Sequence, residues 1–177
     1  KAIRRQRQMC IRDSSGYIYY MMTGNKACKG VGMHKLAIAA DHGGFELKKQ
    51  LIEDYREKGT ELFDLGTYSS DSCDYPDAAQ KMCDVLRTGE AEAGILICGT
   101  GIGISIAANR CPHIRAALLY TDEVARLARE HNNANVAVLG GRTMTFQEAA
   151  RRLDIFLATG FEGGRHQRRI DKIETVK

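Results

Sequence analysis

The stretch Gly94-Ile-Leu-Ile-Cys98-Gly-Thr-Gly-Ile-Gly-Ile-Ser-Ile-Ala-Ala-Asn109 decides how this chain folds. Its apolar run, 95–97, is typical of a central strand in a parallel sheet that is covered on both faces. The glycines that follow allow a tight turn into a helix, and N–H groups at a helix start can bind an anion. We therefore expect a strand, a glycine loop and a helix, with Cys98 at the strand end, where open α/β sheets bind ligands.

Strand-like and helix-like patterns alternate along the rest of the chain. The predicted strands are 35–40, 61–65, 93–98, 115–119 and 136–139. The predicted helices are 45–58, 74–88, the helix that ends near 110, 121–131, 145–158 and 165–176. Strand–helix units of this length predict right-handed crossovers and helices on both faces of a parallel sheet. The predicted fold class is α/β, a three-layer α/β/α domain with a five-stranded parallel, Rossmann-like sheet.

The charge is concentrated at the N-terminus. The 177 residues carry a formal net charge of +4, but residues 1–32 hold seven basic side chains and one acidic side chain. The remainder holds 19 basic and 21 acidic side chains, so we expect no nucleic-acid partner. No run of about 18 apolar residues predicts a membrane span, and the sequence shows no secretory signal. We therefore expect a cytoplasmic protein.

The sequence predicts an N-terminal extension followed by one domain. Residues 1–32 show no amphipathic period and end in a glycine-rich string, so we predict a disordered or non-native extension. Met33 opens the segment whose local signals agree with one another, and residues 33–177 are predicted to form one domain.

The cysteines show no metal-binding or disulfide pattern. They stand at positions 10, 28, 73, 83, 98 and 111, without a C-x-x-C pair and without zinc-type spacing to the five histidines. We therefore expect reduced thiols, no metal and no cofactor.

Polar side chains lie in four loops that we expect to meet at one edge of the sheet, because the loops after parallel strands gather there. These loops are Asp41-His42, Cys98-Gly-Thr100, His131-Asn132 and Gly140-Gly-Arg142. The C-terminal segment adds Arg165, His166, Arg168 and Arg169. Arg165 and Arg169 are four residues apart, so on a helix they share one face and could clamp a phosphate, or they could form a solvated face.

The glycine loop does not match the common nucleotide motifs. It lacks the G-x-G-x-x-G register of dinucleotide sites, and no lysine follows its last glycine as in a P-loop. Two interpretations of the loop remain. Its N–H groups bind a phosphate, a carboxylate or an enediolate oxygen, or the glycines form a purely structural turn.

For each of the other polar residues, the sequence allows both a functional and a structural role. Cys98 is either a thiol activated at a helix start or a small buried hydrophobe. His131 either transfers a proton or ends a helix, and Asp41 either binds a sugar or caps a helix.

Several motifs together resemble a known family, the type B ribose-5-phosphate isomerases and their galactose-6-phosphate isomerase relatives. They are Ala40-Asp-His-Gly-Gly-Phe45, Asp74-Tyr-Pro76, Ile97-Cys-Gly-Thr-Gly-Ile-Gly-Ile-Ser-Ile-Ala-Ala-Asn109, Arg129-Glu-His-Asn-Asn133 and Glu162-Gly-Gly-Arg-His-Gln-Arg-Arg169. The resemblance covers essentially all of residues 33–177.

The resemblance implies cofactor-free interconversion of ribose 5-phosphate and ribulose 5-phosphate in a homodimer whose sites are shared between chains. It makes Cys98 the base, His131 the group that assists ring opening, and Thr100 part of the enediolate site. The substrate-binding residues that it implies are Asp41, His42, Gly99, Gly101, Ile102, Gly103, Asn132, Arg142, Arg165 and Arg169. Isomerisation of galactose 6-phosphate or allose 6-phosphate, and a non-catalytic phosphosugar-binding module, stay open.

Overall fold

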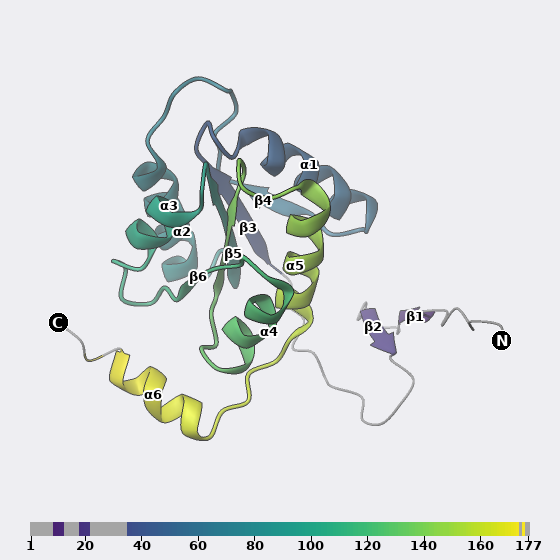
Figure 1. The fold of residues 1–177 in the computed structure, drawn as a ribbon, viewed down its shortest axis with the longest axis vertical. Coiled ribbons are helices and arrows are strands. Elements are labelled where there is room, and N and C mark those ends of the chain that lie inside the picture. The colour runs from purple at the N-terminus through teal and green to yellow at the C-terminus, as the bar shows by residue number, and fades with distance from the viewer. Residues whose placement is uncertain (1–8, 13–17, 22–34, 174, 176–177) are drawn as a thin grey trace.

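A five-stranded parallel sheet forms the middle of the computed structural model, which describes residues 9–12, 18–21, 35–173 and 175 (Figure 1). The strand order is β4-β3-β5-β7-β6, and every neighbouring pair is parallel. The strands are β3 Leu36–Ala40, β4 Leu62–Asp64, β5 Ala93–Cys98, β6 Ala116–Leu118 and β7 Val136–Gly140. The predicted sheet is confirmed.

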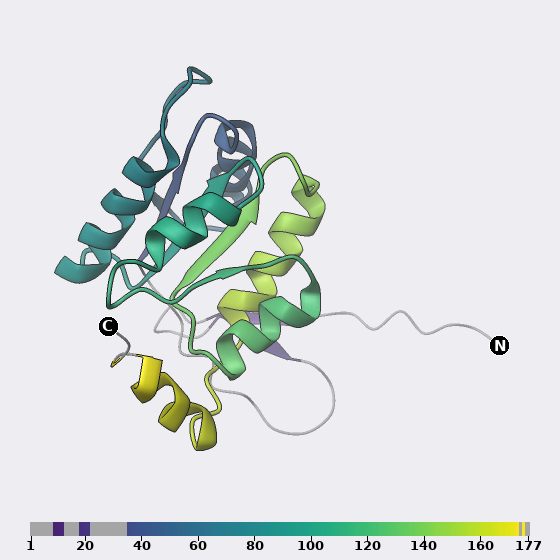
Figure 2. The ribbon, with the colours of Figure 1, turned by 60° about the vertical axis from the view of Figure 1, so that its left-hand side comes forward.

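Helices cover both faces of the sheet, as the turned view makes clear (Figure 2). Buried side chains of α1, α4 and α5 pack on one face, and those of α2 and α3 pack on the other. The helices are α1 Phe45–Glu57, α2 Tyr75–Thr88, α3 Ile102–Ala108, α4 Asp122–Glu130, α5 Phe146–Ala158 and α6 Arg165–Ile173. The predicted three-layer architecture is confirmed, and α6 lies apart from the sheet, beyond α4 (Figures 1 and 2).

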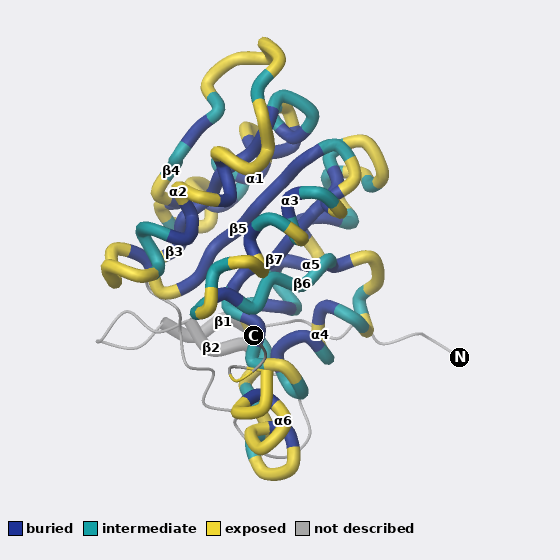
Figure 3. The backbone as a smooth tube through the Cα atoms, turned by 90° about the vertical axis from the view of Figure 1, so that its left-hand side faces the viewer, coloured by how far each residue is buried: buried dark blue, intermediate teal, exposed yellow. Residues whose placement is uncertain are grey.

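The apolar run of β5 fits its central place between β3 and β7. Ile95 and Ile97 belong to the buried cluster on the α1 and α5 side, whereas Leu96 and Cys98 belong to the cluster on the α2 and α3 side. Side chains of a strand alternate between the two faces, so a strand buried on both faces must be apolar throughout. Figure 3 shows β5 as a continuous buried segment.

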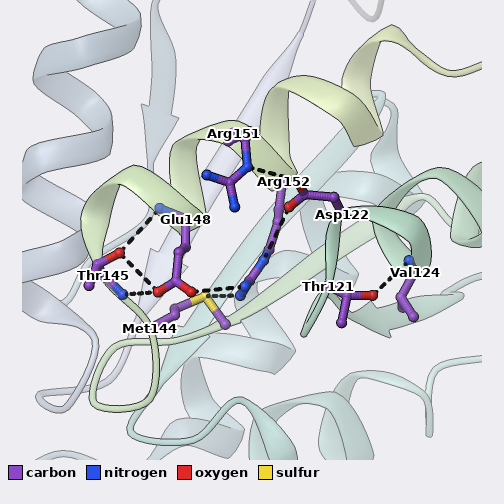
Figure 4. Close-up of polar contacts among 8 residues, drawn as sticks. All are labelled: Thr121, Asp122, Val124, Met144, Thr145, Glu148, Arg151 and Arg152. Atoms are coloured by element: carbon purple, nitrogen blue, oxygen red, sulfur yellow. Dashed lines mark hydrogen bonds and ion pairs between the residues drawn. The ribbon is translucent and has the colours of Figure 1, made fainter.

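The starts of α4 and α5 are joined by polar contacts (Figure 4). Thr145 and Glu148 form a capping box, in which the Glu148 backbone N–H donates to Thr145 Oγ1 and the Thr145 backbone N–H donates to Glu148 Oε2. Arg151 Nε then donates to Asp122 Oδ2 of α4 at 2.8 Å. These contacts fix the first turns of two helices that pack on the same face of the sheet.

An ion pair between a buried lysine and a partly buried aspartate connects α1 to the edge strand β4. The Lys48 side chain is 1% exposed, and its Nζ lies 2.5 and 2.6 Å from the two carboxylate oxygens of Asp64. Asp64 Oδ1 also accepts a hydrogen bond from the Gly66 backbone N–H at 2.9 Å. The pair therefore joins the helix, the strand and the loop that follows the strand.

The expectation that the thiols are reduced is wrong for one pair of cysteines. Cys83 of α2 and Cys111, which follows α3, form a disulfide with a Cα–Cα distance of 6.3 Å. The two residues are 28 positions apart, and only the packing of α2 beside α3 brings them together. The sequence spacing carries no sign of that contact. Cys73 and Cys98 are the free cysteines within residues 35–173.

Two short strands lie within the predicted N-terminal extension. β1 Met9–Arg12 and β2 Ile18–Met21 pair as antiparallel strands. They supply regular structure where the sequence pattern predicts none, whereas Met33, the predicted start, lies outside the described residues. That residues 1–32 are not native stays a prediction. None of the helices described in the structure is long and apolar enough to cross a membrane.

The turns after β3, β5 and β7 approach one another through glycine backbone. An ideal Cβ atom at Gly43 would lie 3.0 Å from the Gly99 backbone, and one at Gly141 would lie 2.4 Å from the Gly43 carbonyl oxygen. Neither distance leaves room for a methyl group between the turns. The contact is backbone against backbone, so it cannot be relieved by a change of rotamer.

We therefore expect Gly141→Ala to lower the free energy of unfolding by about 1–3 kcal/mol, the usual cost of overpacking a fixed backbone. Urea denaturation would measure the change. Gly160→Ala is the matched control, because a Cβ there meets nothing within 4 Å. The control should change stability by less than about 0.5 kcal/mol. Equal stability of the two variants would contradict a close contact at Gly141.

Candidate functional site

Three of the four predicted loops meet at the carboxyl edge of the sheet, where β3, β5 and β7 end. The Asp41 backbone N–H donates to the Ile97 carbonyl at 3.1 Å, and the Gly141 backbone N–H donates to the Cys98 carbonyl at 2.8 Å. The Arg142 backbone N–H donates to the Gly99 carbonyl at 2.9 Å. The end of β5 therefore holds the turns on both sides of it, and residues far apart in the sequence share one surface.

Cys98 lies at the centre of this edge and is 4% exposed. Its Sγ accepts a hydrogen bond from the Gly101 backbone N–H at 3.1 Å. Gly101 has a φ of +82° and is the N-cap of α3, so the tight turn that aims this N–H back at the sulfur needs a glycine. The Ile102 backbone N–H donates to Thr100 Oγ1 at 3.3 Å. Two donors of the loop are thus already directed at predicted site residues.

Arg142 brings a positive charge over the glycine loop. A Cβ atom placed on Gly99 would be 3.5 Å from Arg142 Cδ and 3.6 Å from its Nη1, so the arginine side chain lies across this glycine. Arg142 is itself exposed. Its guanidinium can therefore meet an anionic group that approaches the loop from solvent.

Asp41 and His42 are held in the turn after β3. Asp41 is 6% exposed, and its Oδ1 accepts a hydrogen bond from the Gly44 backbone N–H at 3.1 Å. Gly44 is the N-cap residue of α1, so Asp41 stabilises the start of that helix without being its cap. His42 Nδ1 lies 3.1 Å from the Cys73 carbonyl oxygen and 3.2 Å from the Cys73 backbone nitrogen. This contact fixes the imidazole and leaves Nε2 for a ligand.

Tyr75 is a residue of this edge to which the sequence analysis assigns no role. A Cβ atom on Gly103 would be 2.8 Å from Tyr75 Cζ, so the ring lies against the first turn of α3. Tyr75 opens α2 and is 39% exposed. Its presence in the Asp74-Tyr-Pro76 motif is the signal that could have singled it out.

The expectation that His131 and Asn132 join this edge is wrong within one chain. His131 is the C-cap of α4, and the segment after it leads into β7. The residues that precede a parallel strand lie at the amino edge of the sheet, opposite the residues that follow it. The Arg115 side chain, just before β6, accordingly donates to the Asn132 carbonyl at 3.2 Å. His131 ends a helix, so the rule for strand ends does not apply to it.

The arginines of α6 lie with His131 rather than with Cys98. α6 follows α5 in the chain, lies beyond α4 and extends away from the body of the protein (Figure 1). The Glu162 backbone N–H donates to the Glu130 carbonyl at 3.0 Å, which ties the segment before α6 to the last turn of α4. Arg165 and Arg169 are exposed and four residues apart on one helix face.

His131 forms a cluster with Glu162 and His166. The His131 and His166 rings stack with centroids 4.2 Å apart and planes within 4° of parallel. Glu162 Oε2 lies 3.9 Å from His131 Nε2 and 3.6 Å from His166 Nε2. The pKa of His166 is lowered, first by its burial and then by His131, Arg165 and Arg169, which favours the neutral imidazole.

The same three residues are the group in the described structure that could hold a metal ion, with ligand atoms within 4.8 Å of one another. Two features fit a metal poorly. The lone pairs of two parallel stacked rings do not converge on one point, and Arg165 Nε already donates to His166 Nε2 at 3.3 Å. The arrangement instead suits two imidazoles held beside a carboxylate.

Comparisons with known proteins agree with this fold. A ribose 5-phosphate isomerase of Thermotoga maritima has a structure with a TM-score of 0.79 at 54% identity, covering 80% of this chain and 98% of the other. A type B enzyme of Mycoplasma genitalium with bound ribulose 5-phosphate gives a TM-score of 0.75 at 46% identity, covering 79% and 93%. Ribose-5-phosphate isomerase B of Escherichia coli is 42% identical over 145 residues, which are 82% of this chain and 97% of the relative.

The family model described as Ribose/Galactose Isomerase matches residues 36–173, the whole of the sheet and all the helices around it. The chain belongs to the ribose/galactose isomerase family of enzymes.

Proposed function

We propose that this protein interconverts ribose 5-phosphate and ribulose 5-phosphate. The observation that carries the proposal is the thiol of Cys98 at the end of β5, with the Gly101 N–H directed at its sulfur and Arg142 across the adjoining glycine. Relatives of the family carry the same activity in their names, and one of them was solved with ribulose 5-phosphate. A base, fixed hydrogen-bond donors and a cation for the phosphate are what this reaction requires.

The chemistry proposed at the carboxyl edge is a proton transfer. The Cys98 thiolate removes the proton from C2 of the open-chain aldose, the electron pair forms the C1–C2 double bond, and the carbonyl oxygen becomes an oxyanion. Thr100 and the loop N–H groups from Gly99 to Gly103 stabilise this cis-enediolate. The thiol then returns its proton to C1, the C2 hydroxyl becomes the new carbonyl, and its proton passes to the C1 oxyanion, which gives the ketose with a C1 hydroxyl.

The sugar itself is bound by the turn after β3 in this proposal. Asp41 is buried beside the glycine loop, and His42 is held by the backbone of Cys73 with its Nε2 unbonded within the described residues. Both can accept or donate hydrogen bonds to sugar hydroxyls. The reaction moves protons and leaves the substrate's oxidation level unchanged overall, so the expectation that no cofactor is used is part of the proposal.

We further propose that a second copy of this chain completes the site. Ring opening by His131 and phosphate binding by Arg165 and Arg169 require these groups near Cys98, yet they lie at the opposite edge of the sheet. The second copy would seat on exposed apolar side chains near the glycine loop. Ile102 and Ile106 lie four residues apart on α3 and are 55% and 63% exposed, and Tyr120, which follows β6, is 63% exposed. The extended position of α6 suits a helix that reaches a partner (Figures 1 and 3). Asn132 would enter the shared site with His131.

The cytoplasmic location stays a prediction.

Replacement of the proposed base gives the first test of function. The full chain should convert ribose 5-phosphate to ribulose 5-phosphate without added metal, and Cys98→Ala should lower kcat by about 10²–10⁴-fold, the range for a lost general base. Binding of the phosphosugar, measured by calorimetry, should persist. Cys73→Ala is the control, because Cys73 contacts His42 through its backbone alone.

Two results would count against this assignment. Full activity of Cys98→Ala would remove the thiol from the reaction. Phosphosugar binding without turnover by the unmutated chain would favour the second candidate, a non-catalytic phosphosugar-binding module that uses the glycine loop and Arg142.

Mixed dimers test the shared site. Cys98→Ala and His131→Ala chains should each be impaired alone, and after joint unfolding and refolding the mixture should regain about a quarter of the unmutated activity, because half of the dimers are mixed and each has one intact site. A site built within one chain would give no recovery. Refolding each variant alone provides the baseline.

Substrate length is tested by comparing kcat/KM for five-carbon and six-carbon phosphosugars. We expect ribose 5-phosphate to exceed allose 6-phosphate and galactose 6-phosphate by about tenfold or more, since one carbon in a fitted pocket is worth about 1–3 kcal/mol. A higher kcat/KM for a six-carbon phosphosugar would contradict ribose 5-phosphate as the preferred substrate, although the isomerase reaction would still stand.

A further inference from the structure

His166 is a buried titratable residue for which the proposed reaction has no use. Its side chain is 6% exposed, although the helix that carries it, α6, is mostly exposed on its other faces. One face of its ring is covered by the stack on His131, whose side chain is 35% exposed. The pair therefore joins the end of α4 to the start of α6.

Three contacts define how His166 is held. Its flat face covers the His131 ring at a centroid distance of 4.2 Å. Its Nε2 accepts a hydrogen bond from Arg165 Nε at 3.3 Å, so the ring carries its proton on Nδ1 and is neutral. Burial and the nearby cations lower its pKa in the same sense. A neutral ring can stack on His131 whether His131 carries a charge or not.

Glu162 completes the arrangement. Its carboxylate lies 3.9 Å from His131 Nε2 and 3.6 Å from His166 Nε2, on the same side of both rings. The Glu162 backbone is fixed to the Glu130 carbonyl, so the carboxylate starts from a defined place. Without the stack and the carboxylate, a half-exposed imidazole at a helix end would sample several rotamers.

We infer that His166, with Glu162, is a positioning residue that fixes the His131 ring for opening of the sugar ring. The inference rests on the proposed function. In ring opening, His131 gives a proton to the ring oxygen as the bond from that oxygen to C1 breaks. The C1 hydroxyl loses its proton as the aldehyde forms, and His131 recovers a proton from it. A misdirected imidazole would slow this step and leave the enediolate chemistry of Cys98 unchanged.

The two steps can be measured separately because the two substrates differ in ring form. Ribose 5-phosphate closes a ring through its C4 hydroxyl and must be opened. Ribulose 5-phosphate would need its C5 oxygen to close a furanose, and that oxygen carries the phosphate, so the ketose is open-chain. In deuterated water, enediolate formation from the ketose exchanges a C1 hydrogen and requires no ring opening.

Two rates are therefore compared for the full chain: isomerisation of ribose 5-phosphate and deuterium exchange at C1 of ribulose 5-phosphate. His166→Ala should lower kcat for isomerisation by about tenfold and change the exchange rate by less than about twofold, since only the positioned acid is affected. His166→Phe keeps a flat ring over His131 and should recover most of the isomerisation rate. Glu162→Gln should show the same split to a smaller extent. Gln167→Ala, an exposed change on the same helix, is the control.

The outcomes separate this inference from the function that it rests on. An equal fall of both rates in His166→Ala, or no recovery in His166→Phe, would overturn the positioning role and leave the isomerase function intact. An unmutated chain that performs neither reaction would overturn the proposed function and this inference with it. The NMR shift of the His131 ring protons reports on the stack directly, and it should move in His166→Ala and stay in Gln167→Ala.

Discussion

The contact between glycine backbones at the carboxyl edge is the constraint on which the site depends. Gly43, Gly99 and Gly141 come from turns after three different strands, and no side chain fits between them. Because the turns touch directly, the hydrogen bonds from their N–H groups reach the end of β5, and the Arg142 side chain lies across Gly99, the residue next to Cys98. A strand with a polar or bulky turn at any of these places would hold the thiol and the cation too far apart for one small substrate.

Most of the fold could be predicted because its signals are local. The alternation of apolar runs with helical periods gave the strands within about two residues, and a run such as Ile95–Ile97 has few places in a protein other than a sheet buried on both faces. The meeting of loops at the carboxyl edge could likewise be predicted for the turns that follow strands. The turns that carry Asp41 and Arg142 are hydrogen-bonded to the end of β5 and the loop after it. His131 ends the helix predicted over 121–131, so the rule for strand ends did not apply to it.

Contacts that depend on how two helices pack against each other could not be predicted from the sequence. The Cys83–Cys111 disulfide exists because α2 and α3 lie side by side, and a spacing of 28 residues fits many other arrangements equally well. The stack of His166 on His131 joins elements 35 positions apart in the same way. Each of these residues has an ordinary explanation when it is read alone, and their chemistry appears only when the neighbouring helix is in place.

The ion pair of Lys48 and Asp64 has a consequence for how β4 finds its place. β4 has three residues and lies at the edge of the sheet, so few hydrogen bonds fix its alignment with β3. A shift by one residue would turn Phe63 inward and Asp64 to solvent, and would leave the Lys48 ammonium buried without its counter-ion. A buried ion pair adds little net stability, but a misaligned strand that breaks it is strongly disfavoured. The pair therefore selects one alignment of the edge strand against its close alternatives.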